Sequence, residues 1–259
     1  ETHFVSLPPE KDLAPVTSER RQLQDYRSTE PHLNLTLTVL SCEPRVFEIQ
    51  HFLSETEVHH ILEIATGMSL RRSTTRASGS AQETTSETTR TSRNTWVSRT
   101  KSPIVDTIYR RAADLLQLDE ALLRRRTADE YPDLNTKASI AEDLQLVHYD
   151  VSQQYTPHHD FSIPNSRAVN QPVRFATVLF YLNDDMKGGE TAFPRWKNAE
   201  TGDQLKVTPE VGKAILFYSL LPDGNMDERS EHAALPVIEG EKWLTNLWVW
   251  DPSRQMAYT

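Results

Sequence analysis

Residues Asp143 to Asp160 read DLQLVHYDVSQQYTPHHD and combine a strand pattern with a candidate metal motif. The first part, Leu144 to Tyr149, alternates apolar and polar side chains, which predicts a strand with one buried face. A short polar turn follows, and the stretch ends in His158-His159-Asp160. Residues i and i+2 of an extended chain point to the same side, so His158 and Asp160 can face one point while His159 faces away. Alone, a His-x-Asp pair is weak evidence for a metal site, because most such pairs are solvated or hydrogen-bonded.

A third histidine, His232, opens the later segment HAALPVIEGEKWLTNLWVW. Two histidines and one carboxylate form the facial triad of non-heme Fe(II) oxygenases, which leaves coordination positions open. Lys242 follows in the same segment, and a hairpin joining His232–Ile238 to Lys242–Trp250 predicts that both strands lie in one sheet. There Lys242 can supply a cation for the distal carboxylate of a co-substrate. The alternative is a surface lysine, which the apolar neighbours of Lys242 disfavour.

Composition limits the classes of protein to consider. The chain has 259 residues, enough for one large domain or two small ones, and a net charge of −9 with a pI of about 5.5. This acidic balance disfavours nucleic acid as a partner. No apolar run reaches the length of a membrane span and no signal-peptide core is present, although the start at Glu1 leaves open an upstream anchor or targeting segment. Cys42 is the only cysteine, which excludes an internal disulfide.

The N-terminal part of the chain predicts an arm and then a first helix. Residues 1–43 are polar and contain several prolines, so we expect an extended or poorly ordered arm with an early strand at Leu33–Leu40. Arg45–Phe52 is a second strand candidate. Ser54 to Glu57 has the pattern of a capping box, which predicts a helix that ends at Gly67.

On this first helix we expect His59 and His60 to be exposed rather than ligands. Ser102-Pro103 predicts the start of a second helix, with serine as the N-cap and proline at the first helical position. Between the two helices, residues 71–102 are dominated by Ser, Thr and Arg and cannot form a core. They are either a surface loop or a substrate loop that closes over the site and excludes water.

From residue 143 to Trp250 the pattern consists of short strands separated by turns. Arg174–Leu182 and Ala214–Tyr218 predict buried strands, and Lys187-Gly188-Gly189 and Leu221–Gly224 predict turns. No long helical period interrupts them. The pattern therefore favours a β-sandwich or a barrel.

Three segments together resemble the catalytic domain of prolyl 4-hydroxylases, the Fe(II)- and 2-oxoglutarate-dependent dioxygenases of the secretory pathway in animals, plants and algae. They read YTPHHDF, RFATVLFYLNDDMKGGETAFP and VGKAILFYSLLPDGNMDERSEHAALPVIEGEKWLTNLWVW. The resemblance covers residues 44–251 and is dense from Leu144 onward. Its most specific parts are Gly188–Thr191, the Pro222-Asp223-Gly224 turn and the spacing from His232 to Lys242.

One departure from the family pattern lies between the two predicted helices. Arg90-Thr91-Ser92 and Trp96 match it, but Arg93-Asn94 stands where the family has a small residue and glycine. Residues 120–139 look like an insertion relative to the family, and their Arg124-Arg125-Arg126 is expected to be a solvated turn rather than a binding patch.

The resemblance implies a fold that is α+β and mainly β: a double-stranded β-helix, or jelly roll, buttressed by N-terminal helices. It divides the chain into an arm at 1–43, a dioxygenase domain at 44–251 with its catalytic core at 143–251, and a tail at 252–259. It further implies an endoplasmic reticulum or Golgi lumen location. The oligomeric state is not determined by the sequence.

The implied reaction is the hydroxylation of a peptidyl proline to 4-hydroxyproline with Fe(II), O2 and 2-oxoglutarate, giving succinate and CO2, with ascorbate as reductant. The implied iron ligands, and with them the catalytic residues, are His158, Asp160 and His232. The expected contacts with the distal carboxylate of 2-oxoglutarate are Lys242, Tyr149 and Thr177. The positions that match contacts with a proline-rich peptide are Tyr155, Arg90 and Trp248. For the aromatic residues, and for Trp248 above all, core packing is the alternative.

Two other functions stay open at this stage. An oxygenase of the same superfamily can act on another substrate, such as a free amino acid or another protein residue. A non-catalytic relative can bind proline-rich peptides without chemistry. We disfavour the second alternative, because such a relative is expected to lose an iron ligand or Lys242, and all four residues are present.

Overall fold

A computed structural model describes residues 2–6, 33–76, 83–84, 89–127, 129–130, 137–161 and 172–253. Its largest element is an antiparallel nine-stranded sheet in the order β1-β2-β3-β14-β10-β17-β8-β7-β4. The strands are β1 (Thr2–Ser6), β2 (Leu33–Cys42), β3 (Arg45–Gln50), β4 (Arg71–Arg72), β7 (Arg93–Val97), β8 (Leu144–Tyr149), β10 (Arg174–Tyr181), β14 (Ala214–Tyr218) and β17 (Lys242–Trp250).

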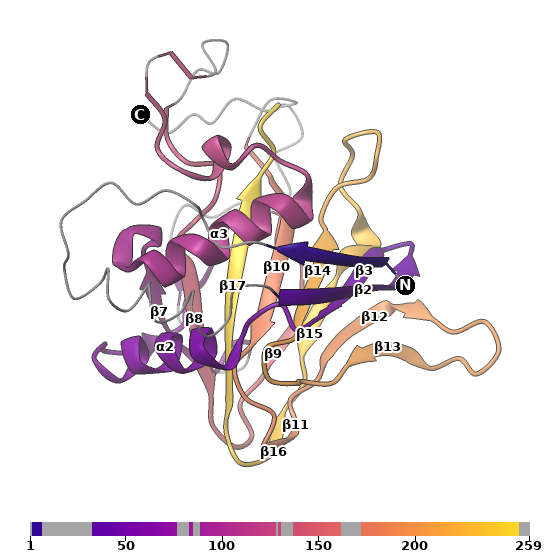
Figure 1. Cartoon of the computed structure of the whole chain (residues 1–259). Helices are drawn as coiled ribbons and strands as arrows, with labels where there is room; N and C mark the ends of the chain where they lie inside the picture. Colours follow the sequence, from indigo (N-terminus) through magenta and orange to yellow (C-terminus); the bar gives the residue numbers. More distant parts are fainter. Residues whose placement is uncertain are drawn as a thin grey trace.

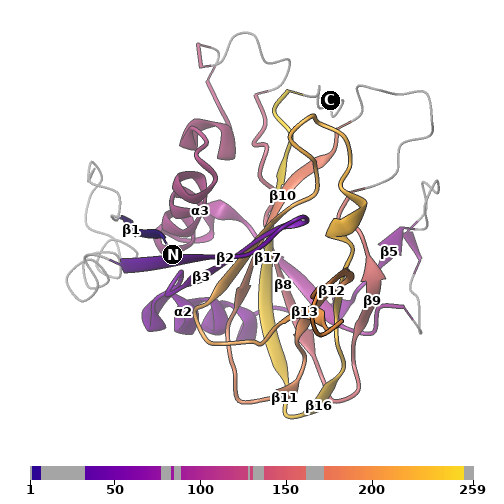
Figure 2. The ribbon, with the colours of Figure 1, turned by 90° about the vertical axis from the view of Figure 1, so that its right-hand side faces the viewer.

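A smaller sheet, in the order β13-β12-β15-β9, lies on one side of the large sheet (Figure 2). Its strands are β9 (Tyr155–His158), β12 (Thr191–Lys197), β13 (Gln204–Val207) and β15 (His232–Ala234). Two short ribbons pair β11 (Lys187–Gly188) with β16 (Val237–Glu239), and β5 (Thr75–Arg76) with β6 (Glu83–Thr84). Two antiparallel sheets that face each other across a core form a jelly roll, so the expected fold class is confirmed.

Two helices cover the other side of the large sheet (Figure 1). They are α2 (Glu55–Thr66) and α3 (Pro103–Leu116), and three single 3-10 turns occur at Arg99–Lys101, Glu120–Leu123 and Glu228–Ser230. Both helix starts follow the sequence prediction: Ser54 and Glu57 form a complete capping box, and the Ser102 hydroxyl caps α3 by accepting from the Val105 amide. The two helices therefore form a layer that packs against one face of the large sheet.

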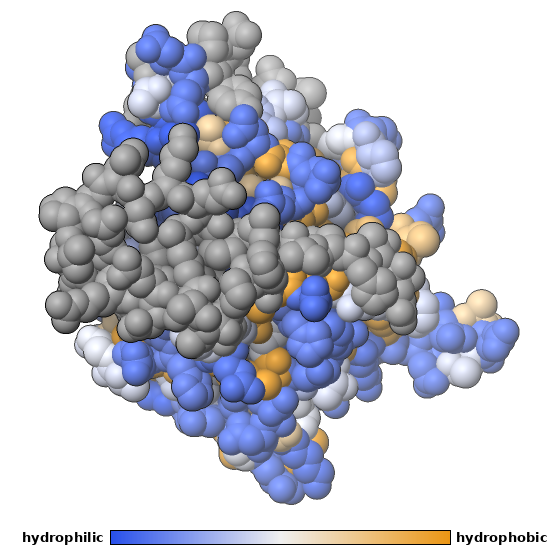
Figure 3. Space-filling model, in the orientation of Figure 1, coloured by the Kyte–Doolittle hydropathy of each residue, from blue (hydrophilic) through white to orange (hydrophobic). Residues whose placement is uncertain are grey.

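The core has two layers. The layer between helices and large sheet contains Val105, Ile108, Val178 and Leu247 among others, and the layer between the two sheets contains Phe193 and Phe217. A fully buried ion pair, Arg111 with Glu57 at 2.7 Å, joins α3 to α2. In Figure 3 the described surface on the helix side is mostly hydrophilic, with smaller hydrophobic areas between the hydrophilic ones.

The structure differs from the sequence prediction for β8 and for the segment after His232. All six residues of β8 are buried, because helices cover one face of the strand and the small sheet covers the other. The predicted single hairpin is wrong: β15 lies in the small sheet, β16 pairs with β11, and β17 lies in the large sheet. The chain crosses from one sheet to the other after His232, so His232 and Lys242 sit on opposite walls of the roll.

The polar segment 71–102 is also more ordered than a surface loop where the structure describes it. β7 pairs along its whole length with β8, which gives β8 a second ladder partner besides β17. Two polar residues expected in solvent are buried: His60 bonds the Ser102 hydroxyl at 2.7 Å, and Arg126 donates to the Leu122 carbonyl. β2 belongs to the large sheet although it falls in the arm; the limits of arm, domain and tail stay a prediction.

Candidate active site

Two histidines and one aspartate from different elements meet between the two sheets. His158 ends β9, His232 begins β15, and the two are register partners in the small sheet. Asp160 follows β9, with its Oδ1 3.9 Å from Nε2 of His158 and its Oδ2 3.7 Å from Nε2 of His232. One ligand atom of each residue lies within 4.8 Å of the others. His159 lies outside this group, half-buried, with its ring nitrogen Nε2 3.0 Å from the Glu228 carbonyl.

The backbone fixes the proton position on both histidines. Nδ1 of His158 lies 2.9 Å from the Thr156 carbonyl, and Nδ1 of His232 lies 3.0 Å from the Ser230 carbonyl. A carbonyl can only accept, so each Nδ1 carries the proton and each Nε2 presents a lone pair to the cluster. Burial, helped by His232, keeps the pKa of His158 well below its usual value. These histidines are therefore prepared as neutral metal ligands.

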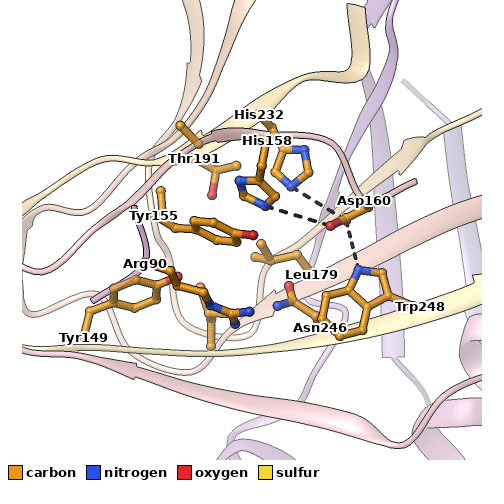
Figure 4. A pocket seen from close by; sticks show the side chains of 13 residues that line it. Arg90, Tyr149, Tyr155, His158, Asp160, Leu179, Thr191, His232, Asn246 and Trp248 are labelled. Carbon is orange, nitrogen blue, oxygen red and sulfur yellow. Dashed lines mark hydrogen bonds and ion pairs between the residues drawn. The ribbon is translucent and has the colours of Figure 1, made fainter. Parts of the chain in front are cut away.

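Asp160 receives two hydrogen bonds on the same oxygen. The Thr177 hydroxyl donates to Oδ2 at 2.6 Å and the Trp248 indole N–H donates to it at 2.9 Å. Burial raises the pKa of Asp160, but the two histidines, the guanidinium of Arg174 and the Thr177 hydroxyl outweigh burial and leave the pKa below its usual value. Because both donors use Oδ2, Oδ1 stays available on the side of His158 as a ligand atom (Figure 4).

A stack of three side chains forms one wall of the site. The Tyr155 ring lies parallel to His158 at 3.5 Å, and the guanidinium of Arg90 covers the Tyr155 ring at 4.8 Å. Arg90 is buried, and it also donates to Gln145 at 2.9 Å. Burial raises the pKa of Tyr155 to about 12, so its hydroxyl stays protonated near neutral pH. The stack joins the outer wall of the cavity directly to a candidate ligand.

Lys242 is fully buried at the start of β17, deeper in the roll than the three candidate ligands. Its Nζ donates to the Gly189 carbonyl and lies 5.5 Å from the Tyr149 ring. Gly189 has a positive φ of 73°, which would strain any other residue, and a Cβ there would come within 3.2 Å of the lysine stem, so the position favours glycine. Burial lowers the pKa of Lys242 to about 7, although Glu190 opposes the shift.

Tyr149 and Thr177, the two hydroxyl residues expected to contact the co-substrate together with Lys242, lie beside different parts of β17. Tyr149 is the register partner of Lys242, and its hydroxyl bonds Ser92. Thr177 instead pairs with Trp248, and about 20 Å of strand at ~3.3 Å per residue separates Trp248 from Lys242. The prediction that Thr177 shares a carboxylate with Lys242 is therefore corrected: its hydroxyl belongs to Asp160.

The residues brought together line a cavity that opens to solvent (Figure 4). Its lining consists of Arg90, Tyr149, Tyr155, His158, Asp160, Leu179, Thr191, His232, Ala233, Ala234, Leu244, Asn246 and Trp248. Sequence reasoning missed Thr191, whose hydroxyl accepts from Tyr181 at 2.7 Å, and Asn246, the register partner of Gln145. For Thr191 a signal was present, since the residue ends the Gly-Gly-Glu-Thr motif, but the only threonine that the sequence analysis named at the site was Thr177.

Comparison with known proteins agrees with this geometry. Residues 144–250 match the 2OG-Fe(II) oxygenase superfamily. A probable prolyl 4-hydroxylase 3 from Arabidopsis thaliana is 33% identical over 223 residues, which is 82% of this chain and 71% of the relative. The chain belongs to the prolyl 4-hydroxylase family. It is a 2-oxoglutarate-dependent dioxygenase, and Fe(II) and 2-oxoglutarate are its cofactor and co-substrate.

Solved structures of prolyl hydroxylases share the fold. A viral collagen prolyl hydroxylase from Paramecium Bursaria Chlorella virus-1, in complex with 2-oxoglutarate, has a TM-score of 0.57 and 24% identity, and covers 79% of this chain and 95% of that one. A Trichoplax adhaerens prolyl hydroxylase in complex with a hypoxia inducible factor peptide fragment has a TM-score of 0.55 and 16% identity, with 90% of both chains covered.

None of the helices in the described part of this prolyl 4-hydroxylase family member is long and apolar enough to span a membrane.

Proposed function

We propose that this chain hydroxylates peptidyl proline at C4, using Fe(II), O2 and 2-oxoglutarate and releasing succinate and CO2. One observation carries the proposal: two Nε2 lone pairs and one free carboxylate oxygen converge in a cavity that is open on one side and walled by Tyr155 and Arg90. The family relatives named prolyl 4-hydroxylases support the substrate class.

His158, Asp160 and His232 are proposed as the iron ligands. Their donor set of two neutral imidazoles and one carboxylate fits Fe(II) and leaves open positions for other ligands. The bound iron would supply the oxidising chemistry with O2 and 2-oxoglutarate. The protein contributes the tautomers of the histidines and the single free oxygen of Asp160.

We assign the distal carboxylate of 2-oxoglutarate to Lys242. The lysine is buried with only the Gly189 carbonyl as a close polar contact among the described residues, so an anion would compensate its charge. Thr191 and Tyr149 line the cavity, Tyr149 as the register partner of Lys242, and both carry hydroxyl groups that can donate to the carboxylate. Leu179 and Leu244 would then pack against the aliphatic part of the co-substrate.

The peptide is proposed to lie against Tyr155, Arg90 and Trp248. Two of these are aromatic and face the cavity, which suits a proline ring, and Arg90 adds donors for backbone carbonyls. A proline-rich segment in the polyproline II conformation suits such a groove, because it is already stiff and its backbone groups are unpaired.

Mass spectrometry of peptides after incubation with Fe(II), ascorbate, O2 and 2-oxoglutarate tests this function. Collagen-like, Ser-Pro-rich and polyproline peptides form the panel, with alanine in place of proline as the control. A gain of one oxygen on proline, placed at C4 by fragmentation and amino-acid analysis, is expected. Oxidation confined to other residues, or no oxidation despite intact binding of iron and 2-oxoglutarate, would refute the proposal.

Two further proposals follow from the family resemblance alone. Ascorbate is proposed as the reductant, and leaving it out of the assay should shorten the period of linear turnover. An endoplasmic reticulum or Golgi lumen location is also proposed. Microscopy of the tagged natural protein in its own cells tests the location, and a purely cytosolic signal contradicts it.

A further inference from the structure

A cluster of four side chains lies at one end of β7, β8 and β17, which we call the β7 clamp: Arg93, His148, Asp150 and Glu241. Arg93 bonds Asp150 at 2.8 Å and Nδ1 of His148 at 3.3 Å. We infer that the clamp fixes the pairing register of β7, and that Arg93 is thereby a positioning residue for the peptide side of the site. The inference rests on the proposed function, because it assigns the clamp to peptide binding.

The proton positions show that the clamp is fully paired. A guanidinium can only donate, so Nδ1 of His148 accepts and Nε2 carries the proton. Nε2 then donates to Glu241 at 2.6 Å. The buried ring also lies 4.3 Å from its register partner Trp243. The clamp therefore ties an exposed arginine of β7 to a buried residue of β8, and through Glu241 to the start of β17.

The same residues could be taken for a metal site, since His148, Asp150 and Glu241 offer ligand atoms within 4.8 Å of one another. A metal ion would need the lone pair of Nε2, but that atom is the proton donor to Glu241. The positive charge of Arg93 already compensates Asp150. The contacts therefore favour a network between strands over a cation site.

The sequence of β7 has too few buried apolar residues to define its pairing register with β8, so the β7 clamp supplies a further constraint. Of its five residues only Val97 is buried, and Trp96 is 42% exposed. A strand held only by backbone bonds can slip, and a shift by two residues would move it about 7 Å along β8. Arg93 at one end and Val97 at the other pair with His148 and Leu144, and together they define one register.

The register of β7 matters because the chain just before it spans both sheets. Arg90 bridges to Tyr155, and the Thr91 amide bonds the Gln154 carbonyl at 3.1 Å, so this part pairs with the small sheet. Three residues after Arg90 the chain is paired with the large sheet at Arg93. A slip of β7 would therefore pull the guanidinium of Arg90 off the Tyr155 ring and away from Gln145.

The test compares Arg93→Ala, Arg93→Lys and Asp150→Asn with Arg71→Ala, a matched control on the neighbouring strand, where Arg71 is exposed and pairs with Asn94. Hydrogen exchange followed by mass spectrometry measures how fast the backbone amides of residues 89–97 exchange, and this measurement does not depend on enzyme activity. Steady-state kinetics measure KM for a peptide that the wild-type protein hydroxylates and KM for 2-oxoglutarate. Nη2 of Arg93 donates to both Asp150 and His148, and Arg93→Lys keeps a charge near Asp150 but lacks this planar, fixed donor group.

In Arg93→Ala we expect faster exchange in residues 89–97 with unchanged exchange in β10. We expect the peptide KM to rise about three- to tenfold with the 2-oxoglutarate KM unchanged within error. Arg93→Lys and Asp150→Asn should lie between this variant and wild type, and Arg71→Ala should match wild type. A purely structural role would instead lower thermal stability and leave the ratio of the two KM values unchanged.

Unchanged exchange in residues 89–97, or faster exchange with an unchanged peptide KM, would overturn the inference. Binding of one Zn(II) that persists in Asp160→Ala but is lost in Glu241→Gln would also overturn it, in favour of a metal site. A wild-type protein that hydroxylates no peptide would refute the proposed function. The exchange measurement would still decide whether the clamp holds β7, so the two failures are distinguishable.

Discussion

The indole N–H of Trp248 is expected to tune metal binding through Asp160, and Trp248→Phe removes this donor while it keeps an aromatic ring in the wall. The ring is buried, and the guanidinium of Arg174 covers it at 3.8 Å. A phenyl ring can keep much of that contact. The substitution therefore isolates the 2.9 Å hydrogen bond to Oδ2 of Asp160 from the packing of the residue.

The magnitude follows from the charge on the acceptor. A hydrogen bond to a charged group contributes about 1.5–3 kcal/mol, and loss of a partner of a metal ligand commonly weakens metal binding about 10- to 100-fold. Asp160 keeps the 2.6 Å bond from Thr177, so we expect the lower part of this range. Thr177→Val should have an effect of similar size, and the double variant should exceed the sum of both, because Oδ2 is then buried without a donor.

Anaerobic titration with Mn(II), followed by electron paramagnetic resonance, measures the affinity without turnover. Trp243→Phe is the matched control, since Trp243 lies on the same strand but faces His148 on the opposite side of the sheet. Wild-type affinity in Trp248→Phe, with the fold intact by circular dichroism, would refute the reasoning and reduce Trp248 to a packing residue.

Three other predictions address the ligands, the co-substrate and the core. Asp160→Ala should abolish 2-oxoglutarate turnover without loss of the fold, because a facial triad has no spare ligand; near-normal turnover would contradict the assignment. Lys242→Ala should weaken 2-oxoglutarate binding by about 2–5 kcal/mol. Because burial lowers the pKa of Lys242 to about 7, the lysine loses its proton above that pH when no co-substrate is bound. The affinity for 2-oxoglutarate should therefore fall as pH rises, and binding at pH ~8 should take up a proton. Calorimetry in buffers of different ionisation enthalpy measures this proton uptake. Arg111→Met should lower the free energy of unfolding in urea by about 3–5 kcal/mol, since it leaves Glu57 charged and buried, and Arg111→Met combined with Glu57→Leu should recover much of that loss.

Much of the local structure was predictable because its causes are local. The capping box at Ser54 and the Ser102-Pro103 start are determined by neighbours within one turn, and both helices begin where these residues stand. The i, i+2 geometry of His158 and Asp160 needs only an extended backbone, and both face the same cluster while His159 stays outside. Family motifs added the identity of the third partner, His232, which no local rule could supply.

Only the tertiary structure determined which wall of the jelly roll each residue joins. A strand pattern gives the two faces of a strand but not the sheet to which it pairs, so the segment from His232 to Trp250 was predicted as one hairpin although it crosses between sheets. The family resemblance placed Thr177 with Lys242, whereas in the folded chain its hydroxyl bonds Asp160, and Thr191 and Tyr149 both line the cavity. The polar strand β7 carries almost no apolar signal, because its order comes from backbone bonds to β8 and from Arg93, and such contacts exist only once distant parts of the chain have met.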